Sequence, residues 1–325
     1  MKIIQIDEFG EPDVLKIREI ARPEISAEND VLVRVHASGV NFFEVLMRRD
    51  RYAVTPPLPA RFGVEVAGVV EAAGAEATLP VGSRVAVPLF AHGRDGGYAD
   101  HVVASESACV PLPDGVLFDA AVALQVQGLT ALHAVRQTAP EGQPVLVTAA
   151  GGGVGTLLIQ LARQAGASRI VALAGSREKL DMALSLGADV AVNHRDDDWL
   201  AQCAAAGGGD GFSTAYDFVG GELGTAVAPL LAPMGTLLFG ALGRFAVDTV
   251  TMNGLLARGQ TVKGFALIPL LQAGNLRQDL TELFRLAASG KLAPVIGARF
   301  ALEQAADAHR LSENRASIGK IVLQP

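Results

Sequence analysis

A run of small residues in the middle of the chain could bind a phosphate group. Residues 145–155 read Val-Leu-Val-Thr-Ala-Ala-Gly-Gly-Gly-Val-Gly, and a helical pattern follows over residues 156–165. A strand that enters a helix through such a turn leaves backbone N–H groups free to hold a pyrophosphate. We expect Ala149 at the tight turn, Gly152 where the backbone approaches the phosphates, and Gly155 where the helix packs on the strand. The predicted dinucleotide loop consists of Ala149, Gly152, Gly153, Val154 and Gly155. A flexible turn in an alanine-rich domain is the alternative.

The residues about twenty positions further on indicate which dinucleotide binds. An NAD site usually offers a carboxylate there, which accepts hydrogen bonds from the ribose hydroxyls. Residues 174–179 instead read Ala-Gly-Ser-Arg-Glu-Lys. The hydroxyl of Ser176 and the cations of Arg177 and Lys179 suit a 2′-phosphate, so the sequence favours NADPH. Alternatively, Arg177 and Lys179 lie on a solvated first helical turn.

Alternating strands and helices must position this loop. Short apolar segments bounded by glycine alternate with helical patterns, which predicts an α/β fold with a doubly wound parallel sheet and a ligand at the carboxyl ends of the strands. The expected strands are 169–174, 189–193, 215–219, 235–240 and 260–265. The expected helices are 178–186, 197–206 and 222–231.

The ends of the chain predict a second, β-rich domain. Short strands such as 31–36 and 64–70 precede the α/β pattern, with turns at several glycines. After about Ala273 we expect a helix to Ser289, followed by a strand at 294–300, a helix at 302–312 and a strand at 320–323. We expect this tail to return to the first domain. The predicted domains are 1–122 with 267–325, and 123–266.

Composition excludes several classes of partner. The chain has 325 residues, a hydrophobic fraction of 50% and a net charge of -7. It contains no run of lysine or arginine, which argues against nucleic acid or an anionic membrane as a partner. Acidic residues occur before any signal-length apolar stretch, and no segment approaches the length needed to span a bilayer. Cys109 and Cys203 form no C-x-x-C pair, so we expect a cytoplasmic protein with two buried thiols.

Short segments along almost the whole chain resemble a known family. The similar segments are 39–42, 57–59, 63–68, 81–85, 96–100, 127–131, 149–155, 187–189, 216–220 and 319–323. The chain resembles the zinc-independent quinone oxidoreductases, the zeta-crystallin-like group of the medium-chain dehydrogenase/reductase superfamily. The resemblance implies a split GroES-like catalytic domain, an inserted Rossmann domain, a cofactor in the cleft between them, and a homodimer.

The ligands of a zinc ion are missing from the sequence pattern. A catalytic zinc needs three protein ligands, and a structural zinc site typically four cysteines. Zinc-dependent relatives carry Gly-His-Glu where this chain has Gly63-Val64-Glu65, and their early cysteine falls within residues 40–42, Val-Asn-Phe. The six histidines form no i, i+4 pair. We therefore expect no metal.

The resemblance also implies contacts with the cofactor. Lys179 matches a 2′-phosphate anchor, and His194 stands where relatives usually have tyrosine. Arg315 matches a further arginine that faces the cofactor. Thr130, Gly240 and Asn41 match positions near the nicotinamide or its ribose.

Hydride transfer to an electron-poor acceptor requires little acid–base chemistry, because the protein mainly positions the donor carbon and excludes water. An enone acceptor also profits from a group that polarises its carbonyl and from a placed proton donor, and Asn41, Tyr52 and Lys179 are the only candidates for these roles. Asn41 and Tyr52 are the candidates for the substrate pocket, and Tyr52 could equally be a loop residue that packs its ring. The leading hypothesis is an NADPH-dependent quinone reductase. An enoyl or alkenal double-bond reductase, which needs a placed proton donor, is the second. A non-catalytic NADPH-binding protein is the third.

Three further features bear on the acceptor and on assembly. Phe62 replaces the proline common in relatives, and residues 91–95, Ala-His-Gly-Arg-Asp, form an unfamiliar polar loop. Either could reshape the acceptor pocket. Residues 247–251 could be an edge strand that pairs with a second chain, or an ordinary internal strand.

Overall fold

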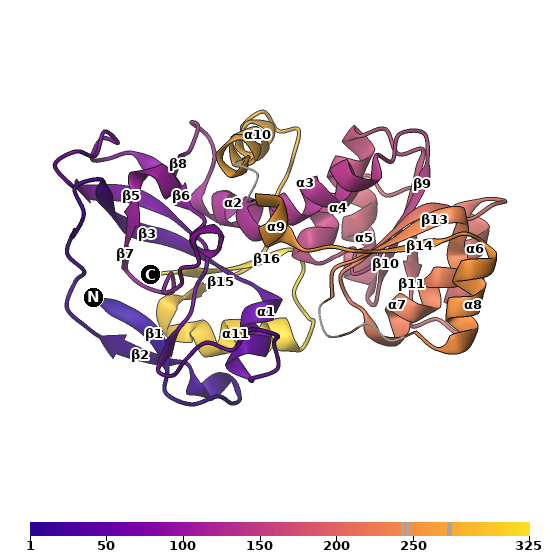
Figure 1. Cartoon of the computed structure of the whole chain (residues 1–325), viewed down its shortest axis with the longest axis horizontal. Coiled ribbons are helices and arrows are strands. Elements are labelled where there is room, and N and C mark those ends of the chain that lie inside the picture. The colour runs from indigo at the N-terminus through magenta and orange to yellow at the C-terminus, as the bar shows by residue number, and fades with distance from the viewer. Residues whose placement is uncertain (242–243, 245–246, 272–274) are drawn as a thin grey trace. The chain divides into compact units, whose positions relative to one another are not determined.

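The chain folds into two compact units, which are described here separately. The computed structural model describes residues 1–241, 244, 247–271 and 275–325. One unit contains Met1–Leu129 and Leu271–Pro325, and the other contains Thr130–Leu270 (Figure 1). The sequence had placed the second domain at 123–266. Within the described ranges, no helix is long and apolar enough to cross a membrane.

The second unit contains the parallel sheet that the sequence predicts. In its described part, six strands pair in parallel in the order β11-β10-β9-β12-β13-β14. They are β9 (Pro144–Val147), β10 (Arg169–Ala174), β11 (Val190–Asn193), β12 (Phe212–Asp217), β13 (Leu231–Phe239) and β14 (Thr261–Gly264). Numbered within the unit, this order is 3-2-1-4-5-6, the order of dinucleotide-binding sheets. The strand order reverses between β9 and β12, where such folds bind their ligands.

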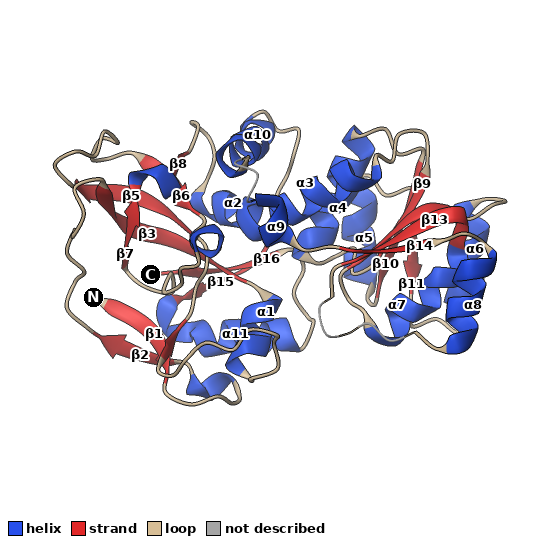
Figure 2. Cartoon of the chain, viewed as in Figure 1, coloured by secondary structure: helices blue, strands red, loops and turns tan. Residues whose placement is uncertain are grey.

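Helices flank this sheet on both sides (Figure 2). The described helices of this unit are α3 (Leu129–Thr138), α4 (Gly153–Gln164), α5 (Arg177–Ser185), α6 (Trp199–Gly207), α7 (Gly221–Val227), α8 (Thr249–Ala257) and α9 (Leu267–Leu271). The core between the sheet and the helices includes Leu146, Leu173, Phe212 and Leu237. Cys203 belongs to the same core, so its thiol is buried and free as expected.

Two local predictions in this unit are wrong. Residues 249–251 of the expected strand form the start of α8, because the Asp248 carboxylate accepts a hydrogen bond from Thr251 N (2.7 Å) and caps the helix. The edge of the sheet is β14 instead. The helix expected to reach Leu231 ends at Val227, and a 3₁₀ turn over Ala228–Leu230, which contains Pro229, leads into β13.

The first unit is β-rich, as the sequence predicts. Seven of its described strands form one sheet, in which β15-β16-β3-β5-β6-β8 are paired in this order and β7 also pairs with β3. Three others form the sheet β2-β1-β4. The bounds are β1 (Lys2–Ile6), β2 (Lys16–Glu19), β3 (Asp30–Val40), β4 (Ala60–Arg61), β5 (Val66–Ala73), β6 (Arg84–Val87), β7 (His101–Ser105), β8 (Val110–Pro111), β15 (Ile296–Ala301) and β16 (Lys320–Gln324).

The C-terminal segment completes the larger sheet. Strand β16 pairs antiparallel with β3, so that Ile321 lies opposite Val40. The helices of this unit are α1 (Phe42–Arg48), α2 (Phe118–Ala123), α10 (Leu276–Ala288) and α11 (Ala305–Glu313). The expected start of α10, Ala273, lies outside the described residues. A π-helical turn, η4 (Leu124–Gly128), follows α2.

Candidate active site

The glycine loop of the second unit has the geometry of a phosphate site. Ala149 adopts a left-handed backbone conformation (φ 46°), which turns the chain sharply after β9. Gly152 is the N-cap of α4, so the helix starts inside the loop. A Cβ on Gly155 would lie 2.8 Å from Ala150 Cα and closer still to Ala149 O. The helix therefore approaches the strand to a distance that only glycine permits, and its N-terminal N–H groups remain available to an anion.

Basic side chains gather near the carboxyl ends of the neighbouring strands. Lys179 packs across the loop, because a Cβ on Gly151 would lie 2.6 Å from Lys179 Cβ and Cγ. At the end of β10, a Cβ on Gly175 would lie 2.9 Å from His194 Nε2 and 3.1 Å from Arg195 Nε. The strands β10 and β11 run in parallel register, which brings these segments side by side.

Two further predicted contacts lie at the start of α5. Ser176 is the N-cap of α5, and Arg177 forms an ion pair with Asp181 at 2.9 Å on an exposed face. Ala174 ends β10, so an apolar side chain occupies the position where NAD sites carry a carboxylate. Arg195 was not among the residues predicted from the sequence, although it directly follows His194 and packs on the same glycine.

The remaining predicted cofactor residues are distributed over both units. Thr130 is buried on α3, at the first position of the second unit. Gly240 follows β13, and a Cβ there would collide with the ring of Phe218. Arg315 belongs to the first unit and adopts a left-handed conformation (φ 51°) in the turn before β16.

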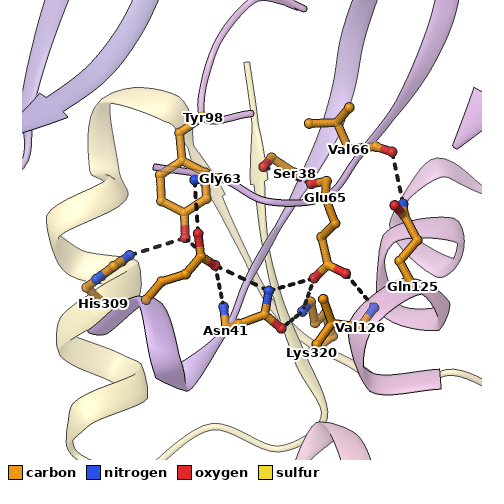
Figure 3. A network of polar contacts seen from close by, with 11 residues as sticks. Ser38, Asn41, Gly63, Glu65, Val66, Tyr98, Gln125, Val126, His309 and Lys320 are labelled. Atoms are coloured by element: carbon orange, nitrogen blue, oxygen red, sulfur yellow. Dashed lines mark hydrogen bonds and ion pairs between the residues drawn. The ribbon is translucent and has the colours of Figure 1, made fainter. Parts of the chain in front are cut away.

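Asn41 lies at the centre of a buried polar network in the first unit (Figure 3). It is the N-cap of α1, and Asn41 N donates to Glu44 Oε2 at 3.0 Å. Asn41 Nδ2 donates to Glu44 Oε2 at 3.2 Å and to Glu65 Oε1 at 2.9 Å. Asn41 Oδ1 accepts from Lys320 Nζ at 2.8 Å. The amide thus joins two carboxyl groups and an ammonium group.

Lys320 and Glu65 form an ion pair with no solvent exposure. Lys320 Nζ lies 2.5 Å from Glu65 Oε1, and both side chains are 0% exposed. The pairing of β16 with β3 brings Lys320 beside Asn41. Gly39 makes the pair possible, because a Cβ there would lie 2.7 Å from Lys320 Cε and closer to Glu65 Oε1. The other Glu65 oxygen, Oε2, accepts from Val126 N in η4 at 2.8 Å.

Glu44 connects this network to an aromatic pair. Tyr98 OH donates to Glu44 Oε2 at 3.3 Å and lies 3.2 Å from His309 Nε2. Burial raises the pKa of the Glu44 carboxyl to about 7, and the negative charge of Glu65 adds to this effect. Burial lowers the pKa of His309 to about 3, so its ring is neutral at physiological pH. Burial also raises the pKa of Tyr98 well above its usual value.

A small cavity borders Glu44 in the same unit. Its volume is about 20 Å³, and it is lined by Glu44, Met47, Pro56, Arg61, Phe62, Val64 and Asp95. Phe62 and the polar loop 91–95 were the two places where the sequence differs from the family pattern. Both contribute to the wall of this cavity, the loop through Asp95. Tyr52 packs its half-buried ring on Phe43, with ring centroids 5.7 Å apart, and burial raises its pKa.

The residues near Asn41 do not fit a zinc site. Val64 offers no donor atom, and both ends of the Asn41 amide already have partners within the network. Among residues 1–241, 244, 247–271 and 275–325, no group of three or more His, Cys, Asp or Glu side chains could hold a metal ion.

Comparisons with known proteins identify the family. Residues 27–114 match the alcohol dehydrogenase GroES-like domain, and residues 186–323 match the zinc-binding dehydrogenase family. A quinone oxidoreductase of Salmonella typhimurium is 33% identical over 333 residues, which cover 99% of both chains. The chain belongs to the quinone oxidoreductase family. It is therefore an oxidoreductase, with the two kinds of domain that its sequence predicts.

Solved structures of the family agree with this fold over its whole length. The Escherichia coli quinone oxidoreductase complexed with NADPH has a TM-score of 0.90 and 28% identity, with 100% of each chain covered. A structure described as an NAD-dependent alcohol dehydrogenase has a TM-score of 0.89 and 30% identity, also over 100% of each chain. The fold thus occurs in relatives described with either dinucleotide.

Proposed function

We propose that the chain is an NADPH-dependent quinone oxidoreductase that transfers a hydride from C4 of the nicotinamide to a quinone without a metal. The observation that carries this proposal is the full-length match to quinone oxidoreductases, combined with a glycine loop on a 3-2-1-4-5-6 sheet. The E. coli relative is described with NADPH bound. When bound, NADPH supplies the hydride, and the chain positions the acceptor and excludes water.

The glycine loop and its basic neighbours would hold the cofactor. Backbone N–H groups of Gly153, Val154 and Gly155, in the first turn of α4, would bind the pyrophosphate, whereas the Gly152 N–H already donates to Ala149 O (2.8 Å). Lys179, with Ser176, Arg177 and His194, would bind the 2′-phosphate, because Lys179 and His194 already pack on Gly151 and Gly175. Arg195 joins this proposed group through its contact with Gly175.

The nicotinamide end is assigned to the remaining predicted residues. Thr130, Gly240 and Arg315 are proposed to contact the cofactor there, as in the family pattern. Asn41 Oδ1 accepts one hydrogen bond, from Lys320, and its second lone pair is the part of the side chain proposed to meet the cofactor. Tyr52 is proposed to line the acceptor pocket.

We further propose a cytoplasmic homodimer that forms through the edge of the parallel sheet. Strand β14 lies at the edge, and all four of its residues are exposed. Unpaired N–H and C=O groups of an edge strand can pair with a second copy of the same chain. Exposed apolar side chains on nearby elements, Met234, Val250 and Leu256, would be covered in such a pair. Two free, buried thiols suit a reducing compartment.

The proposal is tested by measuring anaerobic initial rates of NADPH oxidation with an ortho-quinone, beside identical reactions with a 2-alkenal and with NADH as donor. We expect rapid oxidation of NADPH by the quinone, and slow reaction with the alkenal or with NADH. Faster reduction of the alkenal would identify a double-bond reductase. Tight NADPH binding without turnover of either acceptor would instead indicate a non-catalytic binding protein.

A further inference from the structure

Glu44 is a buried acid without a cation of its own. Glu44, Glu65 and Lys320 are all 0% exposed. Lys320 Nζ contacts Glu65 and Asn41, and within the described residues no ion pair includes Glu44. With both carboxyl groups ionised, this buried group of three would carry one uncompensated negative charge. A buried carboxyl in that position favours its neutral form.

The hydrogen bonds around Glu44 leave room for a proton on one oxygen. Oε2 accepts three hydrogen bonds, from Asn41 N, Asn41 Nδ2 and Tyr98 OH. Among the described residues, Oε1 accepts a single one, from Gly63 N at 2.9 Å. A carboxyl oxygen has two lone-pair sites, so Oε1 can carry the proton without displacing a donor.

The cavity beside Glu44 has space for a water molecule next to the carboxyl. It borders Glu44 and has a volume of about 20 Å³, which is enough for one water molecule. Polar partners for that water are available in Glu44, Arg61 and Asp95, and the other walls are mainly apolar. A single water molecule can transfer a proton between two groups that do not touch.

We propose that Glu44 is the residue that holds the proton for the acceptor, and that it passes this proton through a water molecule in the adjoining cavity. The inference rests on the proposed function and names the missing proton donor of the same site. Tyr98 and His309 act as positioning residues, because the Tyr98 hydroxyl fixes Glu44 Oε2 and the neutral His309 ring adjoins that hydroxyl.

The step balances as a two-electron reduction. The acceptor receives a hydride, which carries two electrons from the dihydronicotinamide, and becomes a hydroquinonate or an enolate. The O–H bond of Glu44 then breaks, and its proton reaches the anion through the water molecule. This leaves a hydroquinone, or the saturated carbonyl compound, and the Glu44 carboxylate. Bulk solvent returns a proton to Glu44 past Arg61 and Asp95.

Burial is the main cause of the raised pKa of Glu44, and its charged neighbours modify that pKa. The carboxylate of Glu65 raises the pKa of Glu44, and the ammonium of Lys320 lowers it. Tyr98 contacts Glu44 as a neutral group, and the neutral His309 ring lies against the Tyr98 hydroxyl. Arg48, on the same helix as Glu44, lowers the pKa of both Tyr98 and His309. Across the cavity stand Arg61 and Asp95, and burial raises the pKa of Asp95.

Infrared difference spectroscopy tests the proton itself, independently of turnover. The full-length protein is titrated from pH 5 to pH 9, and the signal of protonated carboxyl groups is followed. We expect one such signal to be lost with a midpoint near pH 7, to be missing in Glu44→Gln, and to persist in the control Glu24→Gln, which changes an exposed side chain. Glu65→Gln should move the midpoint to lower pH. A signal that is unchanged in Glu44→Gln would overturn the proposal.

Kinetics test the transfer. For Glu44→Gln we expect roughly a hundredfold lower kcat with an enone at pH 6, with an unchanged dissociation constant for NADPH. The solvent deuterium isotope effect of the wild type should disappear in the variant. Equal rates for variant and wild type would refute the transfer, even if the infrared signal were assigned to Glu44. If the wild type reduced neither acceptor, the proposed function would fail, and the spectroscopy would still decide whether Glu44 holds a proton.

Discussion

Gly155 provides a direct test of the close packing at the nucleotide loop. The substitution Gly155→Ala would place a methyl group 2.8 Å from Ala150 Cα and closer to Ala149 O. Real Cβ atoms essentially never approach other atoms to less than 3.0 Å. Both neighbours are backbone atoms, so no side chain can rotate away, and α4 or the loop has to move by several tenths of an ångström.

The size of the effect follows from this geometry. Overpacking of a rigid site costs typically about 1–3 kcal/mol, and a backbone collision places Gly155→Ala in the upper half of that range. Replacing glycine also lowers the conformational entropy of the unfolded chain, which stabilises the folded protein by about 0.4–1 kcal/mol. We expect a net loss of roughly 1–2 kcal/mol, which lowers Tm by about 2–8 °C in a unit of this size. Because the loop N–H groups shift, the dissociation constant for NADPH should rise at least about tenfold.

The assay compares Gly155→Ala with Gly209→Ala in the same unit. A Cβ on Gly209 would meet no atom within 4 Å. Gly209→Ala therefore lowers the conformational entropy of the unfolded chain in the same way as Gly155→Ala, but it causes no collision in the folded protein. Thermal unfolding is followed by circular dichroism, and NADPH affinity by cofactor fluorescence. If Gly155→Ala matched the control in both Tm and NADPH affinity, the loop would not depend on the contact between α4 and Ala149, and our account of it would be wrong.

Three further predictions concern the buried network and the sheet edge. Lys320→Met should destabilise the protein by about 3–5 kcal/mol, since it leaves a buried carboxylate unpaired, and Glu65→Gln added to it should restore much of the loss in urea unfolding. The pKa of His309 is about 3 in the folded protein and 6.5 ordinarily, so between these values His309 takes up a proton only when the chain unfolds. The free energy of unfolding therefore falls as the pH is lowered from about 6.5 toward 3. His309→Gln should therefore lose roughly 2 kcal/mol less than the wild type between pH 7 and pH 5, measured by urea midpoints. Val262→Lys on β14 should give a monomer in analytical ultracentrifugation, and an unchanged dimer would refute the edge pairing.

The geometry of the glycine loop could be predicted from the sequence because its determinants are local. Gly152 and Gly155 act within one strand, one turn and one helix, so their spacing carries the geometry. The prediction of a strand at 247–251 was wrong, and the reason is also local. A run of β-branched residues favours a strand, but the Asp248 side chain caps a helix there, and one hydrogen bond outweighs the weak propensity.

The buried network could not be predicted, because its members are far apart in the chain. Lys320 Nζ and Asn41 Oδ1 are 279 positions apart, and they meet through the pairing of β16 with β3. Glu65, Tyr98 and Lys320 lie in segments whose pattern indicated only the family. A charged residue flanked by glycine or apolar residues, as in Gly319-Lys320-Ile321, was the available signal, and it does not name a partner.

The network also explains why this unit keeps charges that are expensive to bury. An apolar core of equal volume is often as stable as a buried ion pair, so stability alone does not account for Glu65 and Lys320. Glu65 and Lys320 both bind Asn41 at the start of α1, and Glu65 also binds the backbone of Val126 in η4. If β16 paired with β3 in another register, these contacts would be lost and a buried charge would have no partner. Such a group penalises every alternative register of β16 on β3. Under the proposed function, such fixed positioning is what hydride transfer would require here, because the cofactor would supply the chemistry and the protein the geometry.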